Sequence, residues 1–190
     1  MTLRLGVLGS TRGTALQGVI EAIEAGTLDA KIVLIVSDKP DALILQRGLK
    51  HGIHSLHIGK AGLTREAFDA EVTEEFKRAH ADLILMVGYM RIVSAAFVKA
   101  WEGKILNVHP SLLPEFAGGM NRDVHRAVIE SGAKKTGCTI HIVTEDVDAG
   151  PILLQKQCEV LPGDTVETLK ERVQALEQQA FVEVLQKWGK

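Results

Sequence analysis

The sequence predicts an α/β fold: one domain over residues 1–190, with a mainly parallel, doubly wound (Rossmann-like) sheet, antiparallel late strands and a long C-terminal helix. Short runs of Val, Ile and Leu alternate with segments of helical period, as expected for a parallel sheet that helices cover on both faces. Two late strand-like segments follow each other too closely for a helical crossover, which predicts antiparallel pairing there. A chain of 190 residues is long enough to bury a single core without a metal or a disulfide.

Four apolar runs predict the parallel strands, because strands that are covered on both faces read as continuous rather than alternating apolar segments. These runs are Leu3–Leu8, Ile32–Val36, Leu83–Val87 and Ile105–Val108. After the first run, apolar residues from Leu16 to Ile23 keep i, i+3, i+4, i+7 spacing before Gly26, which predicts a helix. The spacing of apolar residues in 68–76 predicts a second helix of about four turns.

The last third of the chain changes character. Gly137–Val143 and Ile152–Val160 resemble two strands joined by an Asp-rich turn, so we expect a mixed sheet. Asp164, with Glu167 three residues later, is expected to cap the final helix. An apolar stripe predicts that this helix packs across the sheet. The stripe consists of Val166, Leu169, Val173, Leu176, Ala180 and Val184.

Composition excludes several classes of protein. The formal net charge is -2 and the pI is about 6.4, so there is no basic footprint for nucleic acid. The two cysteines, Cys138 and Cys158, have no metal-like spacing and favour free thiols in a reducing compartment. The N-terminal residues lack the apolar region of a signal peptide, and no apolar run approaches ~18 residues. We therefore expect a cytoplasmic protein without a membrane or nucleic-acid partner.

The segment Asn107-Val108-His109-Pro110-Ser111-Leu112-Leu113-Pro114 is the most informative motif. Asn107 and His109 stand two residues apart on a predicted strand and so project from the same face. Pro110 cannot donate to a sheet ladder, so the strand ends where these side chains emerge. An amide and a protonated imidazole can both donate to an oxygen that becomes negative in a tetrahedral intermediate. Taken singly, each residue has an ordinary alternative role, the Asn as a turn former and the His as a satisfied polar residue.

This octet, together with Asp148 in Asp-Ala-Gly-Pro, resembles the signature of the folate-dependent formyltransferases. The resemblance extends over nearly the whole chain and is greatest to the branch that formylates glycinamide ribonucleotide in purine biosynthesis. It implies transfer of a formyl group from 10-formyltetrahydrofolate, a cosubstrate, without a metal or a covalent enzyme intermediate. It also makes Asp148 the partner of His109, because a nearby carboxylate favours the protonated ring. Without the octet, Asp146 and Asp148 would be interpreted as turn formers.

The loop Gly9–Thr14 follows the first strand and opens the first helix, so its amides and the helix N-terminus could hold a phosphate. It has neither GxGxxG nor Walker spacing, and a turn with a Ser or Thr helix cap explains the same letters. Relatives usually carry Gly-x-Gly-Ser-Asn here, whereas this chain has Thr11-Arg12-Gly13-Thr14-Ala15. Since Ala15 replaces the Asn, we hypothesise that Arg12 supplies a charge-assisted contact instead. The candidate phosphate contacts are Thr11, Arg12, Gly13 and Thr14.

The resemblance assigns further substrate contacts. Gln174 and Glu177, three residues apart on the last helix, match residues that hold the sugar and the glycyl amine, although most such pairs face water. His125 fits a family position. The preceding segment 115–125 is longer than in relatives by about three residues, which we expect to affect ligand grip more than stability.

Residues 88–93 match the folate-binding turn of the family, where an apolar slot suits a flat pterin. The alternative is that Met90 and Ile92 are ordinary core residues. The expected folate contacts are Met86, Met90, Arg91, Ile92, Val93, Asp146 and Val147. The remaining histidines show no metal spacing and are expected to be structural or solvent-facing. They are His51, His54, His57, His80 and His141.

Several alternative functions stay open. Methionyl-tRNA formyltransferases and formyltetrahydrofolate hydrolases share the chemistry but typically carry an additional domain, for which we expect no room in these 190 residues. The altered phosphate loop keeps a sugar-nucleotide formyltransferase open. A non-enzymatic module that binds a phosphate ligand is the alternative from another class. A homodimer is among the assemblies that the sequence leaves open.

Overall fold

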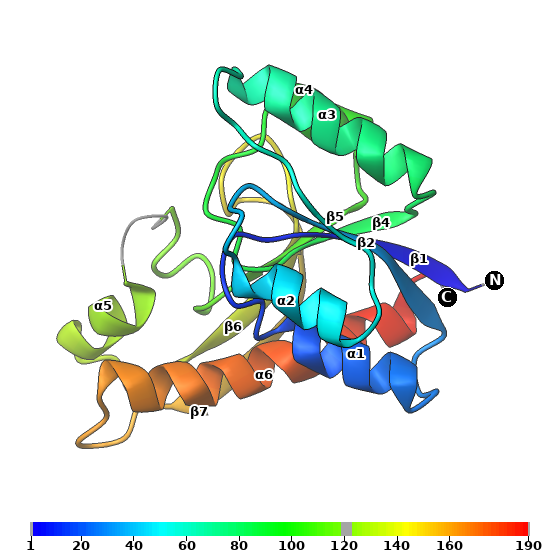
Figure 1. Cartoon of the computed structure of the whole chain (residues 1–190). Coiled ribbons are helices and arrows are strands. Elements are labelled where there is room, and N and C mark those ends of the chain that lie inside the picture. The colour runs from blue at the N-terminus through cyan, green and yellow to red at the C-terminus, as the bar shows by residue number, and fades with distance from the viewer. Residues whose placement is uncertain (1, 119–122, 190) are drawn as a thin grey trace.

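The computed structural model describes residues 2–118 and 123–189. Within these ranges seven strands form one sheet in the order β3-β2-β1-β4-β5-β6-β7 (Figure 1). The strands are β1 (Leu3–Leu8), β2 (Ala30–Ser37), β3 (Ser55–His57), β4 (Leu83–Met86), β5 (Ile105–His109), β6 (Lys135–Ile142) and β7 (Ile152–Glu159). The helices are α1 (Leu16–Glu24), α2 (Leu43–Lys50), α3 (Arg65–Arg78), α4 (Ala95–Ala100), α5 (Val124–Glu130) and α6 (Val166–Lys187).

The strand order confirms the predicted doubly wound sheet. Strands β1 to β5 pair in parallel, while β6 pairs antiparallel with β5 and β7 antiparallel with β6. The chain leaves β1 toward β2 and β3 on one side and continues with β4 and β5 on the other. Ligands of open α/β sheets bind at such a switch, outside the carboxyl ends of the strands.

Two apolar cores lie on the two faces of the sheet, as the continuous strand runs predict. Leu5 and Val7 of β1 pack into the core shared by α1, α2, α5 and α6, whereas Leu8 packs into the core with α3 and α4. Figure 1 shows α3 and α4 on one face and α1, α2 and α6 on the other. Gly6 keeps α3 close to the sheet, because a Cβ there would lie 2.7 Å from the ring of Phe76.

The start of α6 differs from the prediction by one residue. Thr165, not Asp164, is the N-cap, and its side chain exchanges hydrogen bonds with Thr168 in a capping box. Asp164 instead accepts two hydrogen bonds from the Arg172 guanidinium, at 2.8 and 2.9 Å. The charge-assisted pair of Asp164 with Arg172 is stronger than a hydrogen bond from Asp164 to a helix amide. Thr165 therefore takes the N-cap position.

The predicted stripe of α6 faces the sheet, although Val166 and Leu176 are only half-buried. The fully packed side of the helix also contains Glu177, Phe181 and Leu185. A carboxyl group therefore lies among apolar neighbours on this helix. The sequence prediction omitted four short elements, α2, β3, α4 and α5. Among the described residues, no helix has both the length and the apolar character needed to cross a membrane.

Candidate active site

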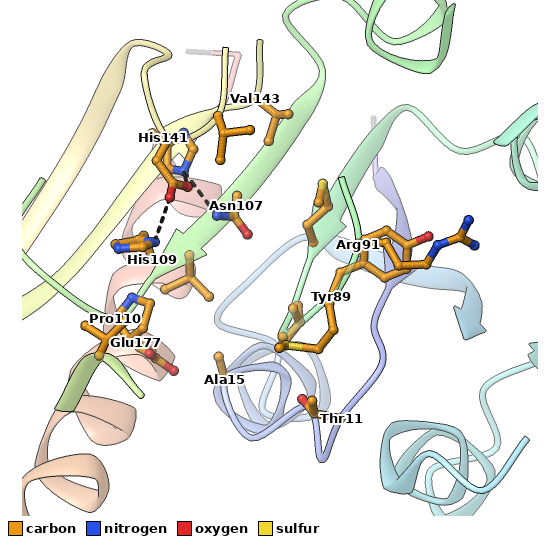
Figure 2. Close-up of a pocket in the computed structure, with 18 of the residues that line it drawn as sticks. Thr11, Ala15, Tyr89, Arg91, Asn107, His109, Pro110, His141, Val143 and Glu177 are labelled. Atoms are coloured by element: carbon orange, nitrogen blue, oxygen red, sulfur yellow. Dashed lines mark hydrogen bonds and ion pairs between the residues drawn. The ribbon is translucent and has the colours of Figure 1, made fainter. Parts of the chain in front are cut away.

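A cavity of about 390 Å³ opens at the carboxyl ends of β1, β4 and β5. Its walls come from the loops after these strands, from the β6–β7 loop, and from α5 and α6 (Figure 2). It brings together all but one of the site residues that the sequence predicted. Those that line it are Asn107, His109, Asp148, Thr11, Gly13, Thr14, His125, Gln174, Glu177, Met86, Met90, Arg91, Ile92, Val93, Asp146 and Val147.

The amide, the imidazole and the carboxylate converge in this cavity. Asn107 and His109 project from the last residues of β5, and Asp148 arrives from the β6–β7 loop. The Asp148 Oδ2 atom lies 3.4 Å from Nδ1 of His109, and both side chains are at most 10% exposed. Salt and water screen a buried ion pair much less than a pair at the protein surface. Asp148 is therefore placed to accept from Nδ1–H and to orient the ring.

The second nitrogen of His109 also faces an acceptor. Its Nε2 lies 3.1 Å from the backbone carbonyl oxygen of Phe116. A neutral imidazole donates at only one nitrogen, whereas imidazolium donates at both. The imidazolium form therefore satisfies both neighbours, with Nδ1–H toward Asp148 and Nε2–H toward Phe116. A ligand oxygen that takes a hydrogen bond from Nε2 replaces the Phe116 carbonyl.

The loops around His109 have an unusual backbone. Phe116 and Asp148 have φ angles of 58° and 54°, in the left-handed region that non-glycine residues seldom adopt. The Gly118 amide donates to Oδ2 of Asp148 at 2.9 Å, which ties the loop after β5 to the β6–β7 loop. Phe116 and Asp148 both contact His109. Strained backbone conformations are often found at functional sites. Residues 119–122, part of the longer segment noted in the sequence, lie outside the described ranges.

His141 belongs to the site, although the sequence suggested a structural or solvent-facing role. It is only 2% exposed and lines the cavity opposite Asn107 in the β5–β6 pair. Its Nε2 lies 3.1 Å from the Asn107 amide nitrogen and its Nδ1 lies 3.1 Å from the Ile142 carbonyl oxygen. Burial lowers the pKa of His141, more than the Ile142 carbonyl and Asp148 raise it. A neutral ring with its proton on Nδ1 donates to Ile142 and accepts from Asn107 (Figure 2).

This arrangement leaves Asn107 with one amide hydrogen for a ligand. The side-chain amide has two N–H donors, and His141 takes one. Asp148 lies 3.6 Å from His141 through Oδ1, so the same carboxylate lies near both rings. Asn107, His109, His141 and Asp148 thus form one polar cluster at the end of β5.

Helix α6 supplies a second polar group of the cavity. Gln174 and Glu177 line it as predicted, together with Lys170, which the sequence analysis did not single out. Its signal was its position one turn before Gln174 on the same helix face. Burial raises the pKa of Glu177 to about 8, and the charge of Lys170 lowers it in part. Burial therefore favours the protonated form of Glu177, and a nearby positive charge favours the carboxylate.

His125 lies in the cavity wall at the start of α5. It is 7% exposed, and within the described ranges its Nδ1 has no hydrogen-bond partner. Burial lowers the pKa of His125, while Asp123 raises it to a smaller extent. A neutral, unpartnered ring nitrogen that borders the cavity suits a polar contact to a ligand.

The loop between β1 and α1 fits the predicted phosphate site in part. Gly13 has a φ of 62°, and a Cβ there would lie 2.4 Å from Ile44, so only glycine fits. Ala15 is the N-cap of α1 and no side chain caps this helix, which rules out the alternative of a Ser or Thr cap. Arg12 does not line the cavity, and its carbonyl oxygen accepts from Nε of Arg47 at 3.2 Å.

The turn after β4 forms the apolar wall. Met90 is 43% and Ile92 45% exposed, so the alternative that they are core residues is wrong. Val147, from the opposite loop, is 41% exposed. Exposed apolar side chains that line a cavity indicate a ligand with a large apolar surface. Among the described residues no group of three or more His, Cys, Asp or Glu side chains is placed to bind a metal.

Comparison with known proteins gives consistent relatives. A family model described as formyl transferase matches residues 3–185. The phosphoribosylglycinamide formyltransferase of Escherichia coli K12 is 38% identical over 90% of this chain and 80% of its own length. The glycinamide ribonucleotide transformylase 1 structure from Symbiobacterium toebii has a TM-score of 0.93 at 40% identity, covering 97% of this chain and 86% of that one.

Other relatives are much longer proteins. The trifunctional purine biosynthetic protein adenosine-3 of Gallus gallus is 44% identical over 97% of this chain. This chain spans only 18% of that protein, and 14% of its counterpart from Drosophila melanogaster.

The contacts of His141 predict its protonation state. Because burial lowers its pKa, we expect its titration midpoint below the usual 6.5, with the proton of the neutral ring on Nδ1. Two-dimensional NMR of the ring nitrogens measures both properties, and a His141→Gln variant assigns the signals. A midpoint above 6.5, or a proton on Nε2 of the neutral ring, would contradict this description of the cluster.

Proposed function

The chain belongs to the formyl transferase family, and on this basis we propose that it transfers a formyl group from 10-formyltetrahydrofolate to the amine of glycinamide ribonucleotide. The observation that carries the proposal is the convergence of Asn107, His109 and Asp148 in one cavity. The named relatives support the choice of acceptor, since phosphoribosylglycinamide formyltransferases match nearly the whole chain.

The chemistry follows from the donors at the end of β5. The substrate amine attacks the formyl carbon, a new C–N bond forms, and the carbonyl oxygen becomes negative. The remaining N–H of Asn107 and the Nε2–H of His109 then donate to this oxygen. The bond from the formyl carbon to the folate nitrogen breaks, and the proton lost by the amine ends on that nitrogen. Asp148 holds the protonated ring during both steps and assists the proton transfer.

The cavity divides into two subsites around this centre. For the ribonucleotide, we assign its phosphate to the backbone amides at the start of α1, where the helix dipole favours an anion. We assign Gln174 to the sugar and Glu177 to the amine. His125 also lines the cavity and is assigned to the ribonucleotide. For the folate, the apolar turn after β4 and the β6–β7 loop form the opposite wall. Its proposed contacts are Met86, Met90, Arg91, Ile92, Val93, Asp146 and Val147.

Glu177 also has a chemical role in this scheme. An amine attacks only as the neutral form, and the substrate amine arrives largely as an ammonium ion. A carboxyl group whose pKa is about 8 has a proton affinity close to that of such an amine at neutral pH. The ammonium favours ionised Glu177, and the carboxylate can then accept the ammonium proton. We therefore assign Glu177 both the recognition and the deprotonation of the amine.

One observation favours a second acceptor class. Ala15 stands where relatives carry the phosphate-binding Asn, and Arg12 lies outside the cavity wall. Amino sugars linked to nucleotides are the acceptors that an altered phosphate loop would suit. An assay of tetrahydrofolate release with glycinamide ribonucleotide and with an amino-sugar nucleotide separates the two. Binding of both ligands without any release would support the non-enzymatic binding module instead.

Removal of one oxyanion donor provides the first test. We expect Asn107→Ala to lower turnover by about a hundredfold or more, because such a donor contributes about 3 kcal/mol to the transition state. Thermal unfolding should show a folded protein. Gln179→Ala, at an exposed position of α6, is the control and should retain full turnover. Near-normal turnover of Asn107→Ala would remove this residue from the mechanism.

Glu177 predicts a particular pH dependence. As the pH rises through about 8 the carboxylate forms, so the rate at subsaturating substrate should rise with it. Glu177→Gln should lose at least tenfold in kcat/KM near pH 7, because the amide accepts no proton, and any rise that it keeps with pH reports deprotonation of the substrate amine alone. The stability should respond in the opposite sense. The folded state keeps a proton that the unfolded chain releases near pH 4.5, so wild-type stability falls between pH 4.5 and 8.

A matched variant makes the Glu177 test decisive. Glu171 is an exposed carboxylate on the same helix, so Glu171→Gln should leave the rate profile and the pH dependence of unfolding unchanged. The assignment fails if Glu177→Gln has the wild-type rate profile from pH 6 to 9.

The missing Asn at the phosphate loop calls for a compensating cation. Lys170 lines the cavity and is expected to contribute, so Lys170→Met should raise KM for the ribonucleotide about tenfold and weaken its salt dependence. Steady-state kinetics at several ionic strengths measure both. Arg12→Ala is compared in the same assay, and an unchanged affinity and salt dependence would exclude Arg12 as a phosphate contact.

A further inference from the structure

Ser10 is buried between two segments that line the cavity, the loop after β1 and the turn after β4. It follows Gly9 at the end of β1 and is 3% exposed. Its hydroxyl oxygen accepts from the Met90 amide at 3.0 Å and its hydroxyl hydrogen goes to Oδ1 of Asp38 at 2.7 Å. Its own amide donates to the Gly88 carbonyl at 3.2 Å. Ser10 therefore joins the loop after β1 to the turn after β4 through its side chain and through its backbone amide.

The direction of these hydrogen bonds is fixed by Asp38. This carboxylate lies just past the end of β2, is 4% exposed, and as an ion only accepts. The hydroxyl of Ser10 has a single hydrogen, and Asp38 takes it. A lone pair is then left for the Met90 amide. The relay runs from Met90 N–H through Ser10 to Asp38, and the charge at its end strengthens both bonds.

The two backbones approach so closely that side chains are excluded between them. A Cβ on Gly9 would lie 2.7 Å from the Val87 carbonyl oxygen, and one on Gly88 would lie 2.2 Å from Oγ1 of Thr11. Gly88 also has a φ of 57°. The loop after β1 and the turn after β4 are therefore packed backbone against backbone, and the Ser10 relay links them.

We propose that Ser10 and Asp38 are positioning residues that couple the ribonucleotide and folate subsites. This inference rests on the proposed function. Thr11 and Gly13 line the part of the cavity that we assign to the ribonucleotide, and Met90 and Ile92 line the part that we assign to the folate. A ligand that orders one segment orders the second through the relay, so each ligand raises the affinity for the other by the same factor.

Calorimetry with glycinamide ribonucleotide and tetrahydrofolate, which together cannot react, measures this factor. In the wild-type protein we expect each ligand to tighten binding of the other fivefold or more. Ser10→Ala should bring the factor below twofold while changing each single-ligand Kd less than threefold. Asp38→Asn keeps an acceptor for Ser10 and should retain the coupling, whereas Asp38→Ala should lose it. The double variant Ser10→Ala/Asp38→Ala should behave like either single variant, because both act through one relay.

Ser37→Ala is the matched control. Ser37 is a fully buried serine beside Asp38, but its hydroxyl oxygen accepts from the Lys39 amide and takes no part in the relay. It should keep the wild-type coupling. Hydrogen exchange of the Met90 amide gives a readout that needs no ligand, and it should accelerate in Ser10→Ala but not in Ser37→Ala.

The outcomes separate the two proposals. Independent binding of the two ligands to the wild-type protein, or intact coupling in Ser10→Ala, would overturn the relay and leave the proposed function standing. Equal weakening of all binding in Ser10→Ala with an unchanged factor would also overturn it, since that indicates a structural role alone. If the wild-type protein binds neither ligand, the proposed function and the relay fall together.

Discussion

The antiparallel pairing of β5 with β6 is the constraint on which the site depends. Its register sets Asn107 opposite His141 and His109 opposite Thr139. Thr139 then holds the loop that leaves β5, because its hydroxyl donates to the Ser111 carbonyl and accepts from the Leu113 amide. The loop between β6 and β7 then brings Asp148 to His109. A shift of one residue would turn both polar side chains of β5 to the other face of the sheet.

The cavity contains two carboxylates in different surroundings. Asp148 lies 3.4 Å from His109 and accepts from the Gly118 amide, so two groups of the protein face its carboxylate. Glu177 is buried, its pKa is raised to about 8, and the charge of Lys170 lowers that pKa in part. Pairs of acids whose environments differ in this way divide the work of acid–base catalysis. In the proposed mechanism Asp148 pairs with protonated His109, whereas Glu177 pairs with the ammonium group of the substrate.

Sequence patterns predicted the elements whose signals are long. The strands β1, β2, β4 and β5 lie at the continuous apolar runs, because both of their faces are covered, and α6 lies at the periodic stripe, because burial of one helix face repeats over several turns. The short elements α2, β3, α4 and α5 were omitted, since six to eight residues or a three-residue edge strand leave little periodicity to detect. The cap of α6 was misplaced because Asp164 and Thr165 are both good caps, and only the contact with Arg172 decides between them.

The site was predictable where the motif is local and not where it depends on register. The octet identified Asn107 and His109, but nothing in the sequence states which residue of β6 faces Asn107. His141 was therefore missed, although it takes one of the two amide hydrogens. Arg12 shows the converse limit. A charged residue adjacent to a glycine turn in sequence need not line the cavity, and Arg12 does not, while its backbone carbonyl accepts from Arg47.

The backbone around His109 explains how one ring serves two states of the site. His109 lies on a strand and its partners lie on loops, where Phe116 and Asp148 adopt left-handed conformations that cost about 1–3 kcal/mol each. Gly118 binds Asp148, so the two loops support each other and the conformations persist. The Phe116 carbonyl lies next to Nε2, the nitrogen that donates to the developing oxyanion in the proposed mechanism. A charged oxygen forms a stronger hydrogen bond than a neutral carbonyl, so in this mechanism the replacement of the Phe116 carbonyl by the oxyanion favours the transition state over the ground state.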